Sequence, residues 1–189
     1  MTTKDSRPTL EVIVYSVADA VAAANGNADR LEIIVNFDKG GMTPPVELVM
    51  DVLASVSVPV RVMIRETEEF TVTEESIIEK LCRSASAFAQ LSIDGLVLGF
   101  VRDDRIDVEL TNRVLSFAPN LKATFHHAFE ELDDPRRAIH DLKQCPQIDR
   151  ILTYGGKGDW TRKIERLVEN PRSIVRKLAR EYLEKVKIV

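Results

Sequence analysis

Residues 30–56 read RLEIIVNFDKGGMTPPVELVMDVLASV, and this stretch decides the fold class. The run RLEIIVNF (30–37) has the aliphatic and β-branched side chains of a buried strand. The glycine turn DKGGMTPP (38–45) ends that strand, and its two prolines suit the start of a helix over 46–56. A strand, a turn and a helix in this order form the repeating unit of an α/β protein.

The same unit recurs along the chain. Further strands are predicted at 10–14, 58–65, 94–100, 121–127, 148–156 and 186–189. Further helices are predicted over 16–26, 71–91, 107–118, 134–144, 160–169 and 171–186. Such alternation gives parallel strands joined by right-handed crossovers. The two architectures that fit are a doubly wound open sheet and a TIM-barrel-like (βα) barrel.

The composition indicates one globular domain. The chain has 189 residues, of which 44% are hydrophobic, and a chain of this length buries a sufficient core without disulfides or structural metals. We therefore assign residues 9–189 to a single barrel-like domain. Residues 1–8 are expected to form a flexible leader.

Charge and cysteine content exclude several classes of protein. The formal net charge is −4 and the basic residues are interleaved with acids, so we expect no nucleic-acid partner. Cys82 and Cys145 lack the spacing of a zinc site or a disulfide framework, which favours a reducing cytoplasm. The segment MTTKDSRPTL lacks the apolar core of a signal peptide, and no apolar run reaches the ~20 residues of a membrane helix. We expect a cytoplasmic protein with no membrane partner.

Ionisable residues interrupt the predicted strands, which is unusual for a parallel sheet covered on both faces. An unpaired buried charge costs several kcal/mol, so these residues must pair with one another or reach water. A barrel interior brings strands that are distant in sequence to a common place, and we therefore predict a TIM-barrel-like fold of about seven strands, incomplete at its C-terminal end. The residues concerned are Glu11, Glu32, Arg61, Arg65, Asp94, His126 and Arg150.

Position along the strands indicates which polar residues lie near the opening of the barrel. Asn36, Arg65 and His126 lie at carboxyl ends, where barrel enzymes have their sites. We predict a ligand pocket formed by Glu11, Glu32, Asn36, Arg65, Asp94 and His126. The alternative is a satisfied polar core without chemistry, and it applies most to Glu11, Glu32, Arg61 and Asp94.

The adjacent His126 and His127 are the candidate metal ligands. Alternation along a strand turns His127 away from the interior if His126 faces it, unless the strand ends before them. The alternative for His127 is a loop residue or a helix-packing residue. His140 lies within a predicted helix among charged neighbours and is expected on the surface.

Several segments resemble consecutive segments of the CutC copper homeostasis proteins. RLEIIVNFDKGGMTPP is similar to that family's R-[IL]-E-L-C-x-N-L-x-x-G-G-x-T-P pattern. VPVRVMIR, DGLVLGFVRDDRIDVE, TFHHAFEELDDP and RILTYGG resemble further family segments in the same order, so that the match runs from about Leu10 to Val189. The resemblance implies a TIM-barrel-like fold, a cytoplasmic location, self-association and a role in copper tolerance or copper binding.

The resemblance also implies which positions matter. The matching residues are Glu11, Glu32, Asn36, Gly40, Gly41, Thr43, Pro44, Arg65, Asp94, Gly95, His126, Phe129, Gly155 and Gly156.

The chain departs from the family pattern in its thiols. Ile13 and Ile34 stand where many family members have cysteine, so the soft ligands that favour Cu(I) are absent there. The family's PRGGDF loop is ETEEF (66–70) in this chain, and its FHRAFD is FHHAFE. Copper, the candidate cofactor, would have to use His126, His127, Met63, Met42 or carboxylates, a set better suited to weak Cu(II) binding.

The end of the chain also departs from the pattern. Family members continue with a glycine-rich loop, an eighth strand and a final helix, whereas this sequence stops at KVKIV. A barrel without an eighth strand has two open edges, and open edges pair or aggregate. We therefore expect a homo-oligomer, or an edge covered by the leader or by the last helix.

Three functions are compatible with these observations. The first is a copper homeostasis protein that binds or buffers copper in the cytoplasm. The second is a barrel enzyme for a small anionic or sugar-like substrate, with Arg65 positioning a carboxylate and His126 or Glu32 moving a proton. The third is a degenerate, non-catalytic scaffold.

Overall fold

Seven parallel strands form the main sheet of the protein. The computed structural model describes residues 9–156, 158–164 and 187–188. Neighbouring strands follow the order β1-β2-β3-β4-β7-β8-β9, and each described pair in this sheet is parallel. Their bounds are Glu11–Val14 (β1), Arg30–Ile33 (β2), Val60–Met63 (β3), Gly95–Leu98 (β4), Lys122–Phe125 (β7), Ile148–Ile151 (β8) and Lys187–Ile188 (β9). The predicted barrel-like sheet of about seven strands is confirmed.

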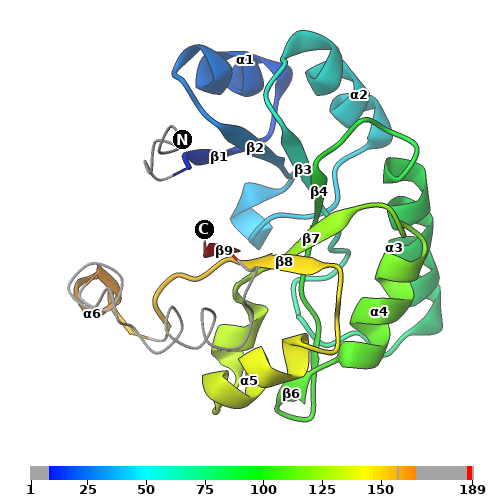
Figure 1. The fold of residues 1–189 in the computed structure, drawn as a ribbon, viewed down its shortest axis with the longest axis vertical. Coiled ribbons are helices and arrows are strands. Elements are labelled where there is room, and N and C mark those ends of the chain that lie inside the picture. Colours follow the sequence, from blue (N-terminus) through cyan, green and yellow to red (C-terminus); the bar gives the residue numbers. More distant parts are fainter. Residues whose placement is uncertain (1–8, 157, 165–186, 189) are drawn as a thin grey trace, which may run out of the picture.

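The helices between residues 17 and 142 lie along the outer, convex face of the sheet, whereas the helix at 160–164 stands apart from it (Figure 1). Three of them begin at caps that the sequence contains: Ser16, Asp107 and Asp134 each accept a hydrogen bond from a backbone N–H of the first turn. The helices are α1 (Val17–Asn25), α2 (Val46–Ser55), α3 (Glu75–Phe88), α4 (Val108–Ser116), α5 (Pro135–Leu142) and α6 (Trp160–Ile164). The predicted leader 1–8 and the helix predicted over 171–186 lie outside the described residues.

Four short elements were not predicted. Two strands, β5 (Val101–Arg102) and β6 (Arg105–Ile106), form an antiparallel hairpin, and a 3-10 helix η1 (Phe37–Lys39) follows β2. A second 3-10 helix, η2 (His127–Glu131), begins directly after His126, two residues beyond the end of β7.

The two faces of the sheet differ in chemistry because residues alternate along each strand. On the outer face, Leu31, Val62 and Phe125 are fully buried and pack in one core with the helices. On the inner face the register pairs Glu11 with Arg30 and Glu32 with Arg61. The inner face is therefore polar at the amino-terminal ends of the strands, and Ile34, Met63 and Val97 form an apolar cluster farther along it.

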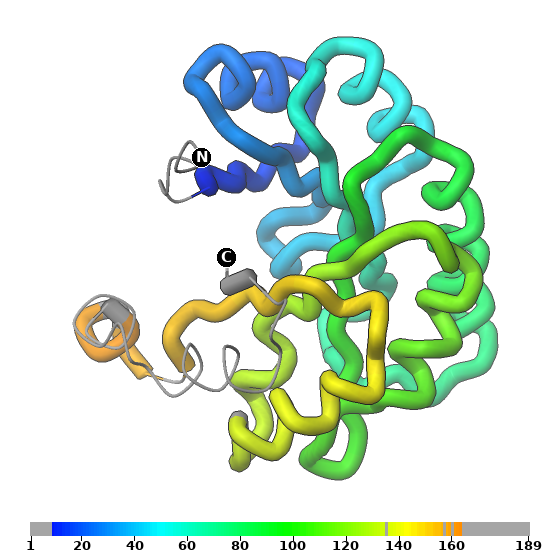
Figure 2. Tube along the Cα trace, in the orientation of Figure 1, coloured from blue at the N-terminus to red at the C-terminus, as the bar shows by residue number. Residues whose placement is uncertain are grey.

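The strands curve so that β1 and β9, the two ends of the strand order, lie on the same side of the molecule (Figures 1 and 2). Within the described residues, no hydrogen-bonded pair joins β1 to β9. In the same part of the chain, no helix has both the length and the apolar character needed to cross a bilayer.

Candidate functional site

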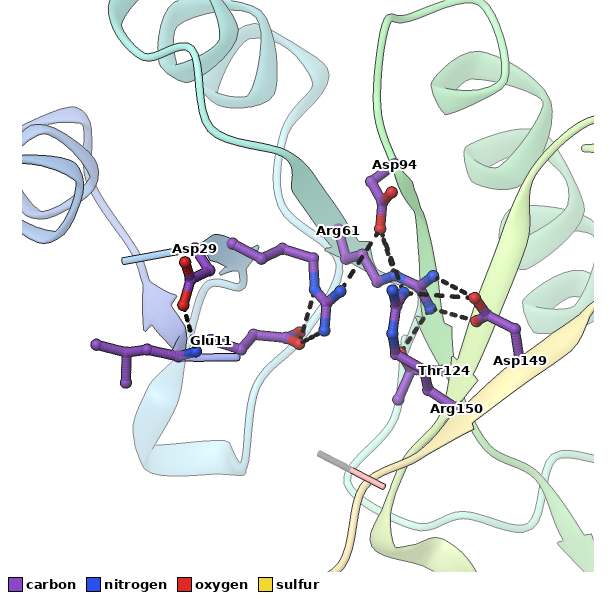
Figure 3. A network of polar contacts seen from close by, with 9 residues as sticks. Glu11, Asp29, Arg61, Asp94, Thr124, Asp149 and Arg150 are labelled. Carbon is purple, nitrogen blue, oxygen red and sulfur yellow. Dashed lines mark hydrogen bonds and ion pairs between the residues drawn. The ribbon is translucent and has the colours of Figure 1, made fainter. Parts of the chain in front are cut away.

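An ion network, which we call the basal network, lies inside the barrel at the amino-terminal ends of the strands. Arg61, with a side chain 1% exposed, donates from Nε to Asp94 at 2.9 Å and from its two terminal nitrogens to Asp149 at 2.9 and 3.0 Å. It also donates to Thr124 Oγ1 at 2.8 Å (Figure 3). The members of the basal network are Glu11, Arg30, Arg61, Asp94, Thr124, Asp149 and Arg150.

The charges of the basal network cancel. Arg30 donates from Nε to Glu11 at 2.7 Å, and Arg150 donates to Asp94 at 3.3 Å. Burial alone would raise the pKa of Asp94, but the hydrogen bond from Arg61 and the nearby arginine charges outweigh it and lower that pKa. Three carboxylates therefore face three guanidinium groups, and the predicted pairing of strand charges inside the barrel is confirmed.

Glu32 lies next to this network, on β2. Burial, followed by the charge of Glu11, raises its pKa to about 8 in spite of the opposing charges of Arg30 and Arg61. Glu32 is therefore mostly protonated at pH 7, so that it adds little charge to the neutral network.

His126 lies at the opposite, carboxyl end of the strands, which we call the barrel mouth. Its ring is fully buried, and Nδ1 accepts a hydrogen bond from the Ala128 N–H at 3.2 Å, which caps η2. A Cβ on Gly99 would lie 2.5 Å from Nδ1, so only glycine leaves room for this ring. Burial, with the charges of His127 and Arg65, lowers the pKa of His126 well below its ordinary value. The imidazole is therefore neutral, and its Nε2 has no hydrogen-bond partner in the described structure.

His127 lies close to His126, with 5.3 Å between ring centroids. Strand β7 ends at Phe125, so the exception to alternation applies and His127 is not turned to the far face. Its ring stacks on Tyr154 at 4.3 Å and meets the edge of Phe70 at 5.4 Å. Burial, then the charges of Arg65 and Lys163, lowers the pKa of His127 to about 4, and its buried Nδ1 lacks a partner among the described atoms.

Arg65 holds the loops of the mouth together. Its guanidinium donates to the carbonyl oxygens of Thr67 at 3.0 Å and Gly40 at 3.1 Å, and also to that of Glu68. It lies over the Phe70 ring at 4.5 Å, and Phe70 in turn packs against His126 at 5.1 Å. Three of its five N–H groups are therefore used within the protein.

The loop that follows β8 covers the mouth near His127. Glu130 Oε1 accepts hydrogen bonds from the backbone N–H of Tyr154 at 3.1 Å and of Gly156 at 3.0 Å, and also from the Thr153 hydroxyl. Gly155 and Gly156 have φ of 87° and 83°, a region that glycine adopts without strain. The loop is thus attached to η2 through one carboxylate.

The residues of the predicted pocket occupy three places. Glu11 and Asp94 belong to the basal network, Glu32 adjoins it, and Arg65 and His126 meet through Phe70 at the mouth. Asn36 lines a separate cavity of about 440 Å³ between the loops that follow β2 and β3, together with Lys39, Met42, Glu66, Thr67, Glu68 and Glu69. A single pocket containing all six predicted residues stays a prediction.

Sequence reasoning missed several residues of the mouth. Phe70 and Tyr154 come from two different loops and Glu130 from η2, and no local pattern marks them as neighbours. The only available signal was the TYGG segment (153–156), whose paired glycines indicate an unusual backbone next to a strand end. His140 is exposed on α5, as predicted.

The donor set at the mouth is small. Among the described residues, no group of three or more His, Cys, Asp or Glu is arranged to hold a metal ion. Ile34 is 2% exposed and packs with Met63 and Val97, so the thioether of Met63 is part of an apolar cluster. The Nδ1 lone pair of His126 is used by the Ala128 N–H, so the single proton of this neutral ring lies on Nε2. The mouth therefore offers the buried Nδ1 of His127, and it offers Nε2 of His126 once that nitrogen releases its proton.

Comparisons with known proteins agree with this architecture. The chain is 35% identical over 147 residues to the human copper homeostasis protein cutC homolog, which covers 77% of this chain and 54% of that protein. It is 32% identical over 149 residues to the family protein CutC of Histophilus somni, covering 77% of this chain and 60% of the relative. The chain thus spans less than two thirds of the length of these curated relatives.

A solved structure and a family model complete the comparison. The crystal structure of CutC from Streptococcus agalactiae superposes with a TM-score of 0.80 at 23% identity, covering 96% of this chain and 86% of that one, which shows a shared fold. The model of the CutC family matches residues 8–179. The chain therefore belongs to the CutC family.

Proposed function

We propose that this chain takes part in copper homeostasis by binding copper as cargo at the barrel mouth, through His126 and His127. The observation that carries the proposal is the pair of neutral, adjacent imidazoles, each with one buried nitrogen that lacks a hydrogen-bond partner in the described part of the chain. Membership of the CutC family and the name of the human relative give the metal. A cytoplasmic location is part of the proposal, and two buried, free cysteines support it.

The chemistry of the site sets the expected affinity. Copper binds a ring nitrogen that carries no proton, and the lowered pKa of His127 leaves that imidazole neutral at neutral pH. In His126 the Nδ1 lone pair accepts from the Ala128 N–H, so copper at Nε2 would displace the proton of that nitrogen. No thiolate contributes, and the charges of Arg65 and Lys163 near His127 oppose a cation. We therefore expect binding of about micromolar affinity, suited to buffering more than to permanent storage.

Copper titration tests the proposal. The purified protein is titrated with Cu(II) and, under reducing conditions, with Cu(I), in competition with a chelator of known affinity. We expect one equivalent of copper with a Kd on the order of micromolar. Absence of binding at this level for both oxidation states would overturn the proposal.

Three variants locate the copper. His127→Phe keeps a ring to stack on Tyr154 and removes the nitrogens. His126→Asn keeps an oxygen in reach of the Ala128 N–H that His126 now caps, and removes Nε2. Each is expected to weaken copper binding at least tenfold, whereas the surface control His140→Gln leaves it unchanged. Equal affinity in all three would place any copper elsewhere.

The enzyme alternative has less support. Its Arg65 was expected to bind a substrate carboxylate, but this guanidinium already donates to three backbone carbonyls. Backbone anchoring of this kind indicates a role in holding the loops.

We also propose that the chain forms a homo-oligomer through the β1 edge. Exposed apolar side chains gather on and beside this strand: Leu10 is 50%, Ile13 39%, Tyr15 58% and Phe37 67% exposed. The rings of Tyr15 and Phe37 lie 6.5 Å apart. Light scattering should give a multiple of the chain mass for the parent, and a smaller mass for Tyr15→Lys. The control is Met50→Lys on α2, where an equally exposed apolar residue, 53%, lies away from this edge.

A further inference from the structure

We infer that Glu130 is a positioning residue that latches Tyr154 over His127, and that release of this latch opens the two imidazoles of the mouth to an incoming ion. The inference rests on the proposed function for the identity of the ion. The cover itself is independent of that identity, because it follows from contacts among Glu130, the 153–156 loop and His127.

One carboxylate oxygen holds the whole loop. Glu130 Oε1 accepts from the N–H groups of Tyr154 and Gly156 at 3.1 and 3.0 Å and from the hydroxyl of Thr153. The Thr153 Oγ1 in turn accepts from the N–H of Gly155 at 3.0 Å. Donors from four consecutive residues thus depend on one side chain, and hydrogen bonds to an ionised acceptor are among the stronger ones.

Glycine lets the loop converge on that oxygen. Gly155 and Gly156 both have positive φ, 87° and 83°, which directs the neighbouring N–H groups to the same side. A loop fixed in this way places the side chain of Tyr154 in a defined direction.

Tyr154 closes the site because of where Glu130 lies on η2. His127 and Glu130 are three residues apart in this 3-10 helix, and side chains with that spacing lie one above the other. The carboxylate that anchors the loop and the imidazole under its ring are therefore on one face. The Tyr154 ring lies 4.3 Å from that of His127 at 27°, and Phe70 contacts the same imidazole at its edge.

The cover accounts for a feature of the site that would otherwise oppose binding. The Nδ1 of His127 and the Nε2 of His126 are both buried, although neither has a protein partner in the described structure. An ion can reach them only if a covering group moves. Tyr154 is the covering group on the outer side, since it is 38% exposed while Phe70 is also held by Arg65.

Histidine modification with diethyl pyrocarbonate tests the latch without any metal. The reagent acylates unprotonated imidazole, so at pH 7.5, above the ordinary pKa of imidazole, the rate at which His127 is modified reports its access. Mass spectrometry follows His127 and uses the exposed His140 of the same molecule as the internal reference. In the parent protein we expect His127 to react at least tenfold more slowly than His140.

Variants of Glu130 give a graded expectation. Glu130→Ala removes the acceptor and should raise the His127 rate at least tenfold relative to His140. Glu130→Gln keeps an amide oxygen in place and should fall between the parent and Glu130→Ala. Glu109→Ala, a control at an exposed acid on α4, should match the parent. A His127 rate unchanged in Glu130→Ala would overturn the inference.

A second variant covers the case in which Glu130→Ala does not fold. Tyr154→Ala leaves the anchor intact and removes the cover, and it should raise the His127 rate by a similar factor. An unchanged rate in Tyr154→Ala would overturn the inference as well. Copper titration separates the two proposals. If the His127 rate rises in Glu130→Ala but the parent protein binds no copper, the proposed function alone is refuted. If the parent binds copper but the His127 rate is unchanged in Glu130→Ala, the latch alone is refuted.

Discussion

Arg61 on β3 and Asp149 on β8 form a bidentate ion pair across the barrel interior, with N···O distances of 2.9 and 3.0 Å. The two residues are 88 positions apart in the sequence, so the pair exists only once the sheet has curved. Because the Arg61 side chain is 1% exposed, its charge is stabilised by the carboxylates that it contacts and not by water.

Removing Arg61 should therefore strongly destabilise the fold. Arg61→Met leaves Asp94 and Asp149 without their main partner, and breaking a buried pair in this way costs about 3–5 kcal/mol. Urea unfolding measures the loss. The control Arg83→Met breaks an exposed i,i+4 pair with Glu79, whose side chains are 68% and 57% exposed, and should change stability little. Equal losses in the two variants would contradict a structural role for the basal network.

Gly99 should be intolerant of any side chain. The Cβ of Gly99→Ala would lie 2.5 Å from His126 Nδ1, so the ring must move and lose its hydrogen bond to Ala128 N–H. We expect a loss of about 1–3 kcal/mol, typical of overpacking, together with loss of copper binding. Gly26→Ala is the control, since its Cβ meets only ordinary contacts at 3.4 Å and its φ is −79°. Thermal unfolding of the two variants distinguishes them, and equal melting temperatures would contradict the steric argument.

Glu32 should make the protein less stable as the pH rises. Its pKa is about 8 in the folded protein against an ordinary 4.5, so between these values the folded chain keeps a proton that the unfolded chain releases. The contribution of this proton to the free energy of unfolding is fully present below pH 4.5. It falls by at most about 1.4 kcal/mol per pH unit as the pH rises to 8. Glu32→Gln should remove this slope.

The test is the difference in unfolding free energy between variant and parent at pH 5, 6, 7 and 8. That difference should grow in favour of Glu32→Gln with rising pH. Glu47→Gln, at an exposed position of α2, should show no such trend. A flat difference for Glu32→Gln would mean that Glu32 is ionised in the folded state.

His127 should make the protein less stable as the pH falls, which is the opposite of the effect of Glu32. Its folded pKa of about 4 lies below the ordinary 6.5, so the stability tied to its neutral form is present above pH 6.5 and is lost as the pH falls toward 4. His127→Phe should therefore be more stable than the parent by about 2–3 kcal/mol near pH 4, relative to their difference at pH 7. Nuclear magnetic resonance gives a direct check: the His127 imidazole signals should stay constant from pH 7.5 to 5.5. A midpoint near 6.5 would contradict the burial of this ring.

The sequence predicted the strand and helix order because that order follows from local periodicity and from caps such as Ser16 and Asp134. The β5–β6 hairpin was missed because its turn uses Asp103 and Asp104, with φ of 50° and 53°. Hairpin turns with positive φ usually contain glycine or asparagine, so two aspartates gave a weak signal.

The interior of the barrel could be predicted only in part. Alternation places Arg150 inside and Asp149 outside, but the pairing of β7 with β8 shifts register between Ala123 and Thr124 and brings both side chains into the basal network. A shift of one residue leaves no mark in the sequence. The mouth was harder still, because Phe70, Glu130 and Tyr154 become neighbours only when two loops and η2 meet at the same end of the sheet.

The charge cancellation within the basal network has a consequence for how this chain can diverge. Each acid in it is matched by an arginine from a different strand, as Asp149 of β8 is by Arg61 of β3. Replacement at one position leaves an uncompensated ion in a partly buried network, so a neutral substitution there depends on a second substitution elsewhere in the chain. Variants recovered from random mutagenesis are therefore expected to carry linked changes on separate strands, and single changes should be recovered mainly at the solvent-facing helices.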